Sequence, residues 1–193
     1  MRPFQAPLFC VALLGCASGP GIDPEREKAA LEAYKAGKRA AEAKNHAEAV
    51  ERFTEAIGRS PGFPQAYLGR ALSREALGSI PSAESDFAAA IGAAAEDEKS
   101  IYHYHSGRFH QRRRRLPEAI ADFTEAIRLQ EKWPDPQYYL MTYLHRGAAL
   151  LDSGRPAEAI RDFDHVLGRN PDPTTRQETE ELKKQALRRK GPP

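Results

Sequence analysis

The sequence predicts an all-α solenoid of four helix–turn–helix repeats, closed by a C-terminal capping helix. Three observations support this fold class: a short motif of small and aromatic residues recurs four times, each copy has helical periodicity, and a small residue precedes each copy at constant distance. The copies are spaced by 34, 36 and 40 residues, and a period near 34 is typical of helical repeat arrays. The alanines that begin the copies are Ala49, Ala83, Ala119 and Ala159.

The second helix of each repeat carries the clearest pattern. Its apolar residues fall at i, i+4, i+7 and i+8, which places them on one face of an α-helix. Pro81, Pro117 and Pro156 stand at the front edge, where a helix tolerates proline. The alanine lets a neighbouring helix approach, and the phenylalanine one turn later fills the remaining space. The predicted second helices are residues 46–57, 81–91, 117–127 and 156–167.

The first helix of each repeat is predicted upstream, over residues 25–43, 64–77, 100–113 and 138–153. Each contains a small residue 12 positions before the alanine of the second helix: Gly37, Ala71, Gly107 or Gly147. Glycine inside a helix costs about 1 kcal/mol relative to alanine. Three glycines at equivalent points therefore indicate that two helices cross closely there.

These features resemble the tetratricopeptide repeat, and the resemblance also rests on the closing prolines Pro61 and Pro171. The chain departs from the family pattern at Ala95, where repeat two lacks its closing proline, and in the absence of the usual early tryptophan. Two residues are inserted near Glu98 and about six near residues 134–137. The expected repeats are residues 30–63, 64–97, 100–133 and 140–173, within a repeat domain of residues 30–173.

Residues 174–193 are expected to form the capping helix and a short tail. Residues 175–190 carry acidic side chains early and basic ones late, the order that the helix dipole favours. Leu182, Ala186 and Leu187 provide a narrow apolar edge. A solenoid needs such a helix to cover its last exposed face.

Residues 1–15 are expected to be a signal peptide. Arg2 precedes an uncharged, mostly apolar stretch that is too short for a membrane-spanning helix of about 20 residues. Residues 13–16 (Leu-Leu-Gly-Cys) resemble the lipobox of bacterial lipoproteins, which implies that Cys16 becomes the first mature residue and carries the lipid. The alternative is an ordinary signal peptide cleaved after Ala17 or Gly19, which would leave a soluble exported protein.

Residues 16–29 would then contain the lipidated cysteine, a tether and the start of the first helix. Ala17 and Ser18 resemble the pattern that permits export to the outer membrane, so the expected location is the bacterial cell envelope, anchored in the outer membrane and facing the periplasm. Asp23 is a suitable N-cap for the first helix. The repeats contain no cysteine, so no disulfide framework is expected.

Composition and motifs argue against nucleic-acid binding and against catalysis. The formal net charge is only +2, with 29 basic and 27 acidic residues, so no nucleic-acid partner is expected. No nucleophile–base pair, phosphate loop, HExxH motif or paired-carboxylate site is visible, so we expect no enzyme, no cofactor and no small-molecule substrate.

The histidines of the third and fourth repeats do not predict a metal site. His103 and His110 share a helix face two turns apart, and no carboxylate or cysteine is expected nearby to complete a coordination shell. His105 and His145 occupy equivalent positions in adjacent repeats. If they meet in the groove, both would become charged near pH 6 and weaken partner binding.

The resemblance implies that the first helices line a concave groove. Several candidate positions are apolar although the repeat does not need them for its core, which predicts an exposed strip for an extended peptide or an amphipathic helix. The alternative is that some of them pack against the inserted loops or the tether. The groove candidates are Tyr34, Lys38, Ala41, Gln65, Leu68, Leu72, Glu75, Ile101, Tyr104, Arg108, Gln111, Met141, Leu144, Ala148 and Leu151.

The family's carboxylate clamp, by contrast, is not expected. Of the positions that match it (Tyr34, Lys38, Gly69, Ile101 and His105) only Lys38 has a suitable side chain, so an adaptor for chaperone tails is disfavoured.

A run of four arginines is the strongest local charge: Arg112, Arg113, Arg114 and Arg115. Cations are favoured at a helix C-terminus, so one interpretation is a solvated helix end. The other is an edge that contacts an acidic protein, an anionic lipid headgroup or a glycan.

Together these patterns predict a non-catalytic scaffold that holds a partner protein in the groove and assists secretion, pilus assembly or outer-membrane assembly. Two rivals remain open. One is a regulator of a cell-wall enzyme that acts through the arginine edge, and the other is a soluble exported binding protein.

Overall fold

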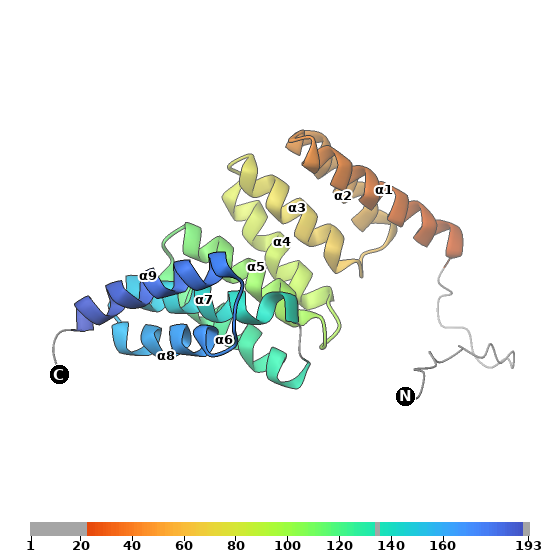
Figure 1. Ribbon diagram of the computed structural model, residues 1–193. Coiled ribbons are helices and arrows are strands. Elements are labelled where there is room, and N and C mark those ends of the chain that lie inside the picture. Colours follow the sequence, from red (N-terminus) through yellow and green to blue (C-terminus); the bar gives the residue numbers. More distant parts are fainter. Residues whose placement is uncertain (1–22, 134–135, 191–193) are drawn as a thin grey trace, which may run out of the picture.

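The part of the chain that the structure describes is helical throughout, with no strand. The computed structural model describes residues 23–133 and 136–190 (Figure 1). Within this part, no helix has both the length and the apolar character needed to cross a membrane. The helices are α1 (Pro24–Glu42), α2 (His46–Arg59), α3 (Pro64–Ala76), α4 (Ile80–Ala93), α5 (Lys99–Arg112), α6 (Leu116–Lys132), α7 (Pro136–Asp152), α8 (Pro156–Leu167) and α9 (Pro173–Lys190).

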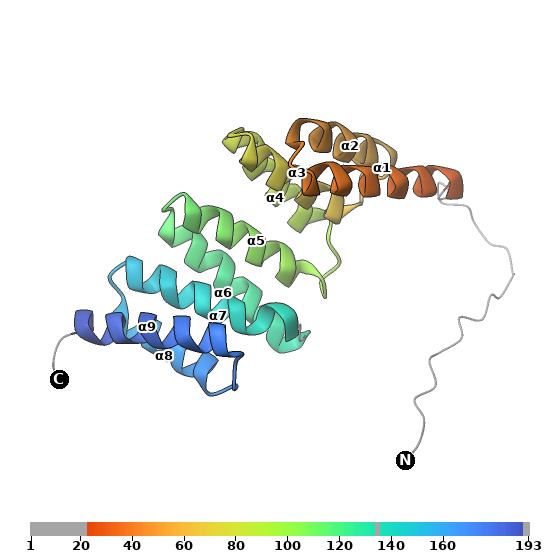
Figure 2. The same ribbon diagram turned by 45° about the horizontal axis from the view of Figure 1, so that its top comes forward.

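The helices associate in consecutive pairs. α1 with α2, α3 with α4, α5 with α6 and α7 with α8 make the most extensive contacts. α5 also contacts α7, and α7 contacts α9, so these helices lie side by side in Figure 2. This stacked arrangement of helix pairs confirms the predicted all-α solenoid.

The turn inside each repeat has the same length and conformation. Three residues connect the two helices of every pair, and the middle one always has positive φ. Gly78 (φ 76°) and Gly154 (φ 78°) occupy this position in repeats two and four, where glycine carries no steric penalty. Lys44 (φ 61°) and Arg114 (φ 57°) occupy it in repeats one and three. Arg114 is therefore a turn residue in a conformation unfavourable to side chains with a Cβ.

A buried phenylalanine against a small residue forms the centre of each repeat. Phe123 and Phe163 are fully buried, and Phe53 and Phe87 nearly so. A Cβ at Gly107 would lie 2.7 Å from Cε1 of Phe123, and one at Gly147 would lie 2.6 Å from Cε1 of Phe163. The close helix crossing predicted from the glycines is confirmed. A side chain at these positions would overlap the edge of the phenylalanine ring.

The inserted residues before repeat four mainly lengthen helices. α6 continues to Lys132, beyond the predicted end at Ile127, and α7 begins at Pro136. The added turn is held by burial, because Leu129 and Gln130 are 2% and 1% exposed. The Nε2 atom of Gln130 donates to Oγ1 of Thr142 at 3.4 Å, which ties the extension to α7.

Both ends of the array match the sequence prediction. Oδ1 of Asp23 accepts a hydrogen bond from the amide of Glu25, so the predicted N-cap is confirmed. α9 packs against α8 and α7, with Ala186 and Thr179 fully buried. An Arg189 nitrogen donates to the backbone oxygen of Leu151 at 3.0 Å. α9 therefore caps the last repeat.

At one junction in the array the two helix backbones approach less closely than at the others, and the buried rings of Phe109 and Tyr102 lie between them. α4 and α5 make far fewer close contacts than any other pair of consecutive helices. We call the boundary between α4 and α5 the central seam. It divides the described residues into an N-terminal half, α1–α4, and a C-terminal half, α5–α9.

Candidate functional site

The first helices of repeats one and two form an open apolar pocket. Its volume is about 280 Å3, and α1 and α3 contribute almost all of its lining. Six predicted groove residues line it: Tyr34, Lys38, Ala41, Gln65, Leu68 and Leu72. Leu72 is 38% exposed at this pocket, and its neighbours there are also apolar, so it belongs to an exposed apolar patch.

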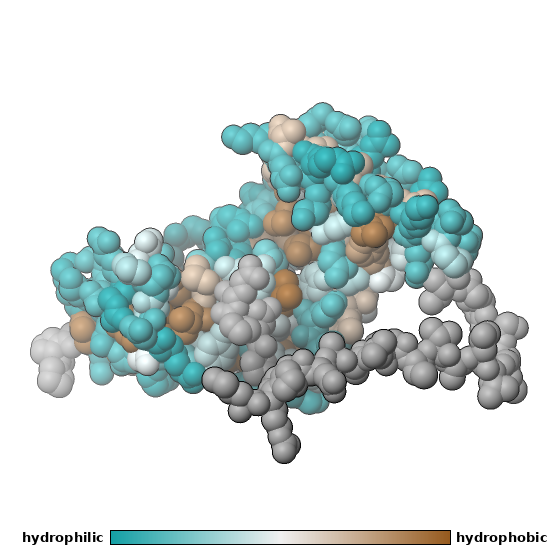
Figure 3. Space-filling model, turned by 45° about the vertical axis from the view of Figure 1, so that its right-hand side comes forward, coloured by the Kyte–Doolittle hydropathy of each residue, from teal (hydrophilic) through white to brown (hydrophobic). Residues whose placement is uncertain are grey.

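The apolar surface continues past this pocket toward the N-terminal end of α1. Leu31 is 43% exposed and lines a second pocket with Phe63, the first residues of α3 and the C-terminal end of α4. Gln65 lines both pockets and joins them. The sequence analysis did not include Leu31, although it stands at the position equivalent to Gln65 in the repeat. On the face shown in Figure 3, apolar residues gather in a hollow surrounded by hydrophilic surface.

Three predicted groove residues belong to the core instead: Tyr104, Leu144 and Leu151. Leu144 is fully buried in the cluster that also contains Ala186 of the capping helix. Tyr104 is 6% exposed and packs against Phe123 and Tyr138. Their expected exposure is therefore wrong: α9 and the insertion before repeat four provide apolar neighbours that the sequence comparison between repeats did not reveal.

The predicted groove positions in the C-terminal half offer little open apolar surface. Ile101 and Met141 are half-buried, and Met141 packs against two core clusters. Ala148 is also half-buried, and Leu151 is 2% exposed. The open apolar strip is therefore confined to α1 and α3.

Arg108 is the groove's charged residue in repeat three. It is half-buried, and one guanidinium nitrogen lies 3.1 Å from the hydroxyl oxygen of Tyr104 and 2.7 Å from Nε2 of His145. Within the described part of the chain, no carboxylate lies within ion-pair distance of Arg108, since none of the ion pairs found there includes it. A half-buried guanidinium without a counter-ion is electrostatically incomplete.

The histidines beside Arg108 remain neutral well below pH 6. Burial, reinforced by Arg108 and Arg112, lowers the pKa of His105 to about 4 and the pKa of His145 to about 3. The expectation that both would become charged near pH 6 is therefore wrong. The neutral His145 accepts from Arg108 and leaves the positive charge of the guanidinium uncompensated.

Comparison with known proteins assigns the family. Two tetratricopeptide repeat family models match the chain, one over residues 34–99 and the other over residues 98–170. Together these matches span more than half of the sequence. The chain belongs to the tetratricopeptide repeat family. Proteins of this family generally mediate protein–protein interactions, and the fold is typically a non-catalytic scaffold.

Solved structures with the same fold share little sequence identity with this tetratricopeptide repeat protein. The structure described as Pseudomonas aeruginosa pilF is 19% identical, with a TM-score of 0.69 over 82% of this chain and 69% of that chain. MamA is 14% identical, with a TM-score of 0.63 over 84% and 92%. YrrB, described as having an unusual peptide-binding site, is 16% identical, with a TM-score of 0.62 over 88% and 90%. A search of curated proteins found no match.

The arginine run bridges the central seam of the tetratricopeptide array. Two nitrogens of Arg112 donate to the Glu75 carboxylate of α3 at 2.9 and 2.6 Å, and Arg113 approaches the same carboxylate at 3.9 Å. Arg115 donates to Glu84 of α4 at 2.7 Å and also pairs with Glu118.

Three of the four arginines are therefore already engaged within the molecule. Arg114, the turn residue with positive φ, is exposed and has no ion pair within the described residues. The run thus has a structural role across the seam, and only Arg114 of the four has its charge uncompensated.

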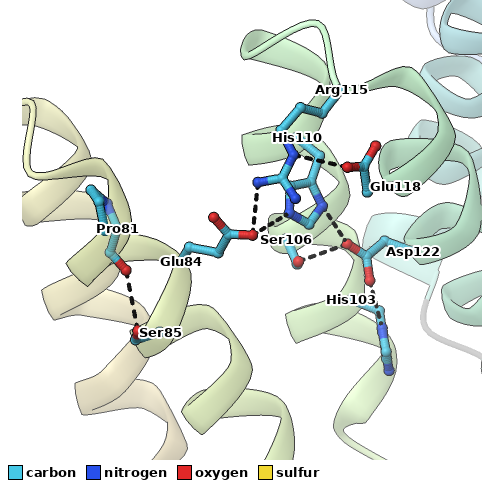
Figure 4. A network of polar contacts seen from close by, with 9 residues as sticks. All are labelled: Pro81, Glu84, Ser85, His103, Ser106, His110, Arg115, Glu118 and Asp122. Atoms are coloured by element: carbon cyan, nitrogen blue, oxygen red, sulfur yellow. Dashed lines mark hydrogen bonds and ion pairs between the residues drawn. The ribbon is translucent and has the colours of Figure 1, made fainter.

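A polar network joins α5 to α6 next to the seam (Figure 4). Nδ1 of His103 lies 3.1 Å from one Asp122 oxygen, and Nδ1 of His110 lies 2.9 Å from the other. Burial alone would raise the pKa of Asp122, but hydrogen bonds from His103, His110 and Ser106 lower it to about 2. The expectation that no carboxylate lies near these histidines is therefore wrong.

This network is a structural one by its geometry. Both histidines direct Nδ1 at the same carboxylate, so each ring is a donor to Asp122. Nε2 of His110 lies 3.6 Å from Glu84, which connects the network to α4 across the seam. Among the residues that the structure describes, no group of three or more potential ligands is arranged to hold a metal ion.

Cys16 and the rest of the expected signal segment lie outside the described residues.

Proposed function

We propose that this protein is a non-catalytic scaffold of the bacterial cell envelope, which holds an apolar segment of a partner protein in the groove formed by α1 and α3. The observation that carries the proposal is the pocket of about 280 Å3 with Leu72 exposed at its edge. An apolar strip open to solvent costs free energy in a free protein and is typical of an interaction site. The tetratricopeptide fold supports the same kind of activity.

The envelope location belongs to this proposal and rests on the N-terminal sequence. A lipid on Cys16 would anchor the chain in the outer membrane, with the repeats in the periplasm. Assistance to secretion, pilus assembly or outer-membrane assembly is the process we propose. The resemblance to the structure described as Pseudomonas aeruginosa pilF is consistent with it at the level of fold.

Photo-crosslinking in living cells tests the groove. A photoreactive amino acid replaces Leu72 in one strain and Glu51, an exposed residue of α2, in the control strain. Capture of one partner from position 72 and not from position 51 is the expected result. Equal capture from both positions, or none from position 72, would contradict a groove-bound partner.

Two variants separate binding from anchoring. Leu72→Asp should keep its helical circular dichroism and urea midpoint, because the side chain is exposed, and should reduce partner binding at least tenfold. Cys16→Ser should abolish metabolic labelling with a fatty acid without changing the affinity of the groove. Fatty-acid labelling that persists in Cys16→Ser would show that the lipid is attached elsewhere.

A further inference from the structure

The groove carries two positive charges that the described part of the chain does not neutralise, one on each side of Leu72. From this arrangement we propose that it selects an extended segment with an acidic residue, an apolar residue about three positions later, and a second acidic residue three to four positions after that. The inference rests on the proposed function and specifies the chemistry of the partner.

Lys38, Leu72 and Arg108 occupy the same position in the first three repeats. Each directly follows the small residue that crosses the second helix (Gly37, Ala71 and Gly107). Lys38 and Leu72 line one pocket. The ion pair between Arg112 and Glu75 connects α5 to α3 one turn beyond Arg108 and Leu72, so the row continues across the central seam. The order along the groove is cation, apolar, cation.

Both cations lack a carboxylate partner. Lys38 is exposed, and no ion pair of the described residues includes it. Arg108 contacts only the uncharged Tyr104 hydroxyl and the neutral His145 ring. The pKa values of His105 and His145 are lowered mainly by burial, and the nearby Arg108 and Arg112 add to the effect, so neither ring carries a charge beside Arg108. A carboxylate from a partner would complete the ion pairs that this chain leaves open.

The acidic residues of the groove do not supply this charge. Glu75 is held by Arg112 and Arg113. Glu42 lines the same pocket as Lys38, at the end of α1. An acidic partner residue would be attracted by Lys38 and repelled by Glu42, so Glu42 limits the affinity and removing its charge should increase it.

The spacing follows from helix geometry. Neighbouring packed helices lie about 8–10 Å apart. An extended chain advances about 3.3 Å per residue, so one repeat corresponds to about three residues of the partner. The step from Leu72 to Arg108 is the wider one, because contacts between the two halves are sparse. An α-helix, which rises about 1.5 Å per residue, would need about seven residues for each step.

Gln65 favours an extended partner over a helical one. Its side chain lines both pockets and makes no hydrogen bond within the described residues. An extended segment has free backbone N–H and C=O groups, which an amide side chain can pair with, whereas a helix satisfies its own. The row and this amide together fit an extended acidic segment.

Synthetic peptides and the full chain test the inference. The probe is a fluorescent peptide, Gly-Glu-Ser-Ser-Leu-Ser-Ser-Glu-Gly, capped at both ends so that no terminal carboxylate contributes. We expect it to bind with an affinity that falls as salt rises. Replacing both Glu by Lys should weaken binding at least tenfold, and replacing Leu by Ala should weaken it about fivefold. A peptide with seven-residue spacing and high helix propensity should bind more weakly.

Protein variants assign the charges. Lys38→Gln and Arg108→Gln should each weaken binding of the acidic peptide about five- to tenfold, Arg108→Lys should retain most of it, and Glu42→Gln should strengthen it two- to threefold. The matched control is Lys35→Gln on the same helix, whose lysine pairs with Glu32 and lies outside the pocket; its affinity should equal that of the wild type.

The outcomes distinguish the two proposals. If Leu72→Asp loses the crosslinked partner while acidic and basic peptides bind equally, the groove is a binding site and the charge selection is wrong. If no capped peptide binds, or if the peptide with seven-residue spacing binds best, the proposal of an extended acidic segment is wrong. If Leu72→Asp has no effect on partner capture, the groove itself is not the binding site and the proposed function fails.

Discussion

Replacing Gly107 by alanine tests the close contact at the centre of repeat three. The new Cβ would lie 2.7 Å from Cε1, 2.8 Å from Cδ1 and 3.1 Å from Cζ of Phe123, whose ring is fully buried and cannot move into solvent. Forcing extra volume into such a site costs about 1–3 kcal/mol. Alanine returns about 1 kcal/mol through its better helix propensity, so the net change is a loss of up to about 2 kcal/mol.

Gly58→Ala is the matched control, because a Cβ at Gly58 would meet nothing within 4 Å. It should raise stability by up to about 1 kcal/mol. Since the propensity gain is similar in the two variants, their difference isolates the steric cost, about 1–3 kcal/mol. The assay is urea unfolding followed by circular dichroism at 222 nm.

A double-mutant cycle identifies the source of the loss. Phe123→Leu removes the ring edge that Gly107 faces, so Gly107→Ala should cost less in that background than in the wild type. Equal stability of Gly107→Ala and Gly58→Ala, or a loss unaffected by Phe123→Leu, would refute the explanation of the glycine as a helix crossing.

Four further variants test the buried charges and the central seam. Asp86→Ala should lower the free energy of unfolding by about 3–5 kcal/mol, because it leaves two half-buried arginines that now donate at 2.7–2.9 Å without their carboxylate. The pKa of His145 falls to about 3 on folding, so its protonation does not reduce the free energy of unfolding above pH 6.5 and reduces it increasingly as the pH drops toward 3. His145→Gln should therefore make the urea midpoint depend less on pH over that interval. Arg115→Glu should lower the urea midpoint at low salt, since it faces two glutamates, whereas Arg114→Glu should leave it unchanged. Equal midpoints for the two arginine variants would show that the bridge across the seam contributes nothing.

The repeat core was predictable because its chemistry is local and periodic. Gly107 and Phe123 are 16 residues apart, and their identity, spacing and fourfold recurrence already specify a small residue against a ring. The turn residue Arg114 was less evident, since an arginine at the position of Gly78 and Gly154 is recognised only once the three-residue turns are aligned.

The groove was predictable only in its N-terminal half. Leu68 and Leu144 occupy equivalent positions, but Leu68 lines the open pocket and Leu144 is fully buried, because the capping helix contributes Ala186 to the cluster around Leu144. The arginine run was ambiguous for a related reason. Its main partner, Glu75, is 37 residues from Arg112, and no periodic pattern connects them.

The central seam combines buried aromatic packing with ion pairs that are sensitive to ionic strength. Apolar contacts change little with moderate salt, whereas exposed ion pairs weaken as the Debye length shortens. The bridges from Arg112 and Arg115 are half-exposed, so salt should weaken them, whereas Phe109 of α5 stays buried against Phe87 of α4. A bound segment that crosses from Leu72 to Arg108 would contact both the N-terminal and the C-terminal half. Part of its binding free energy would then restrict motion of the two halves relative to each other. Its affinity would therefore depend on how far that motion is already restricted in the free protein.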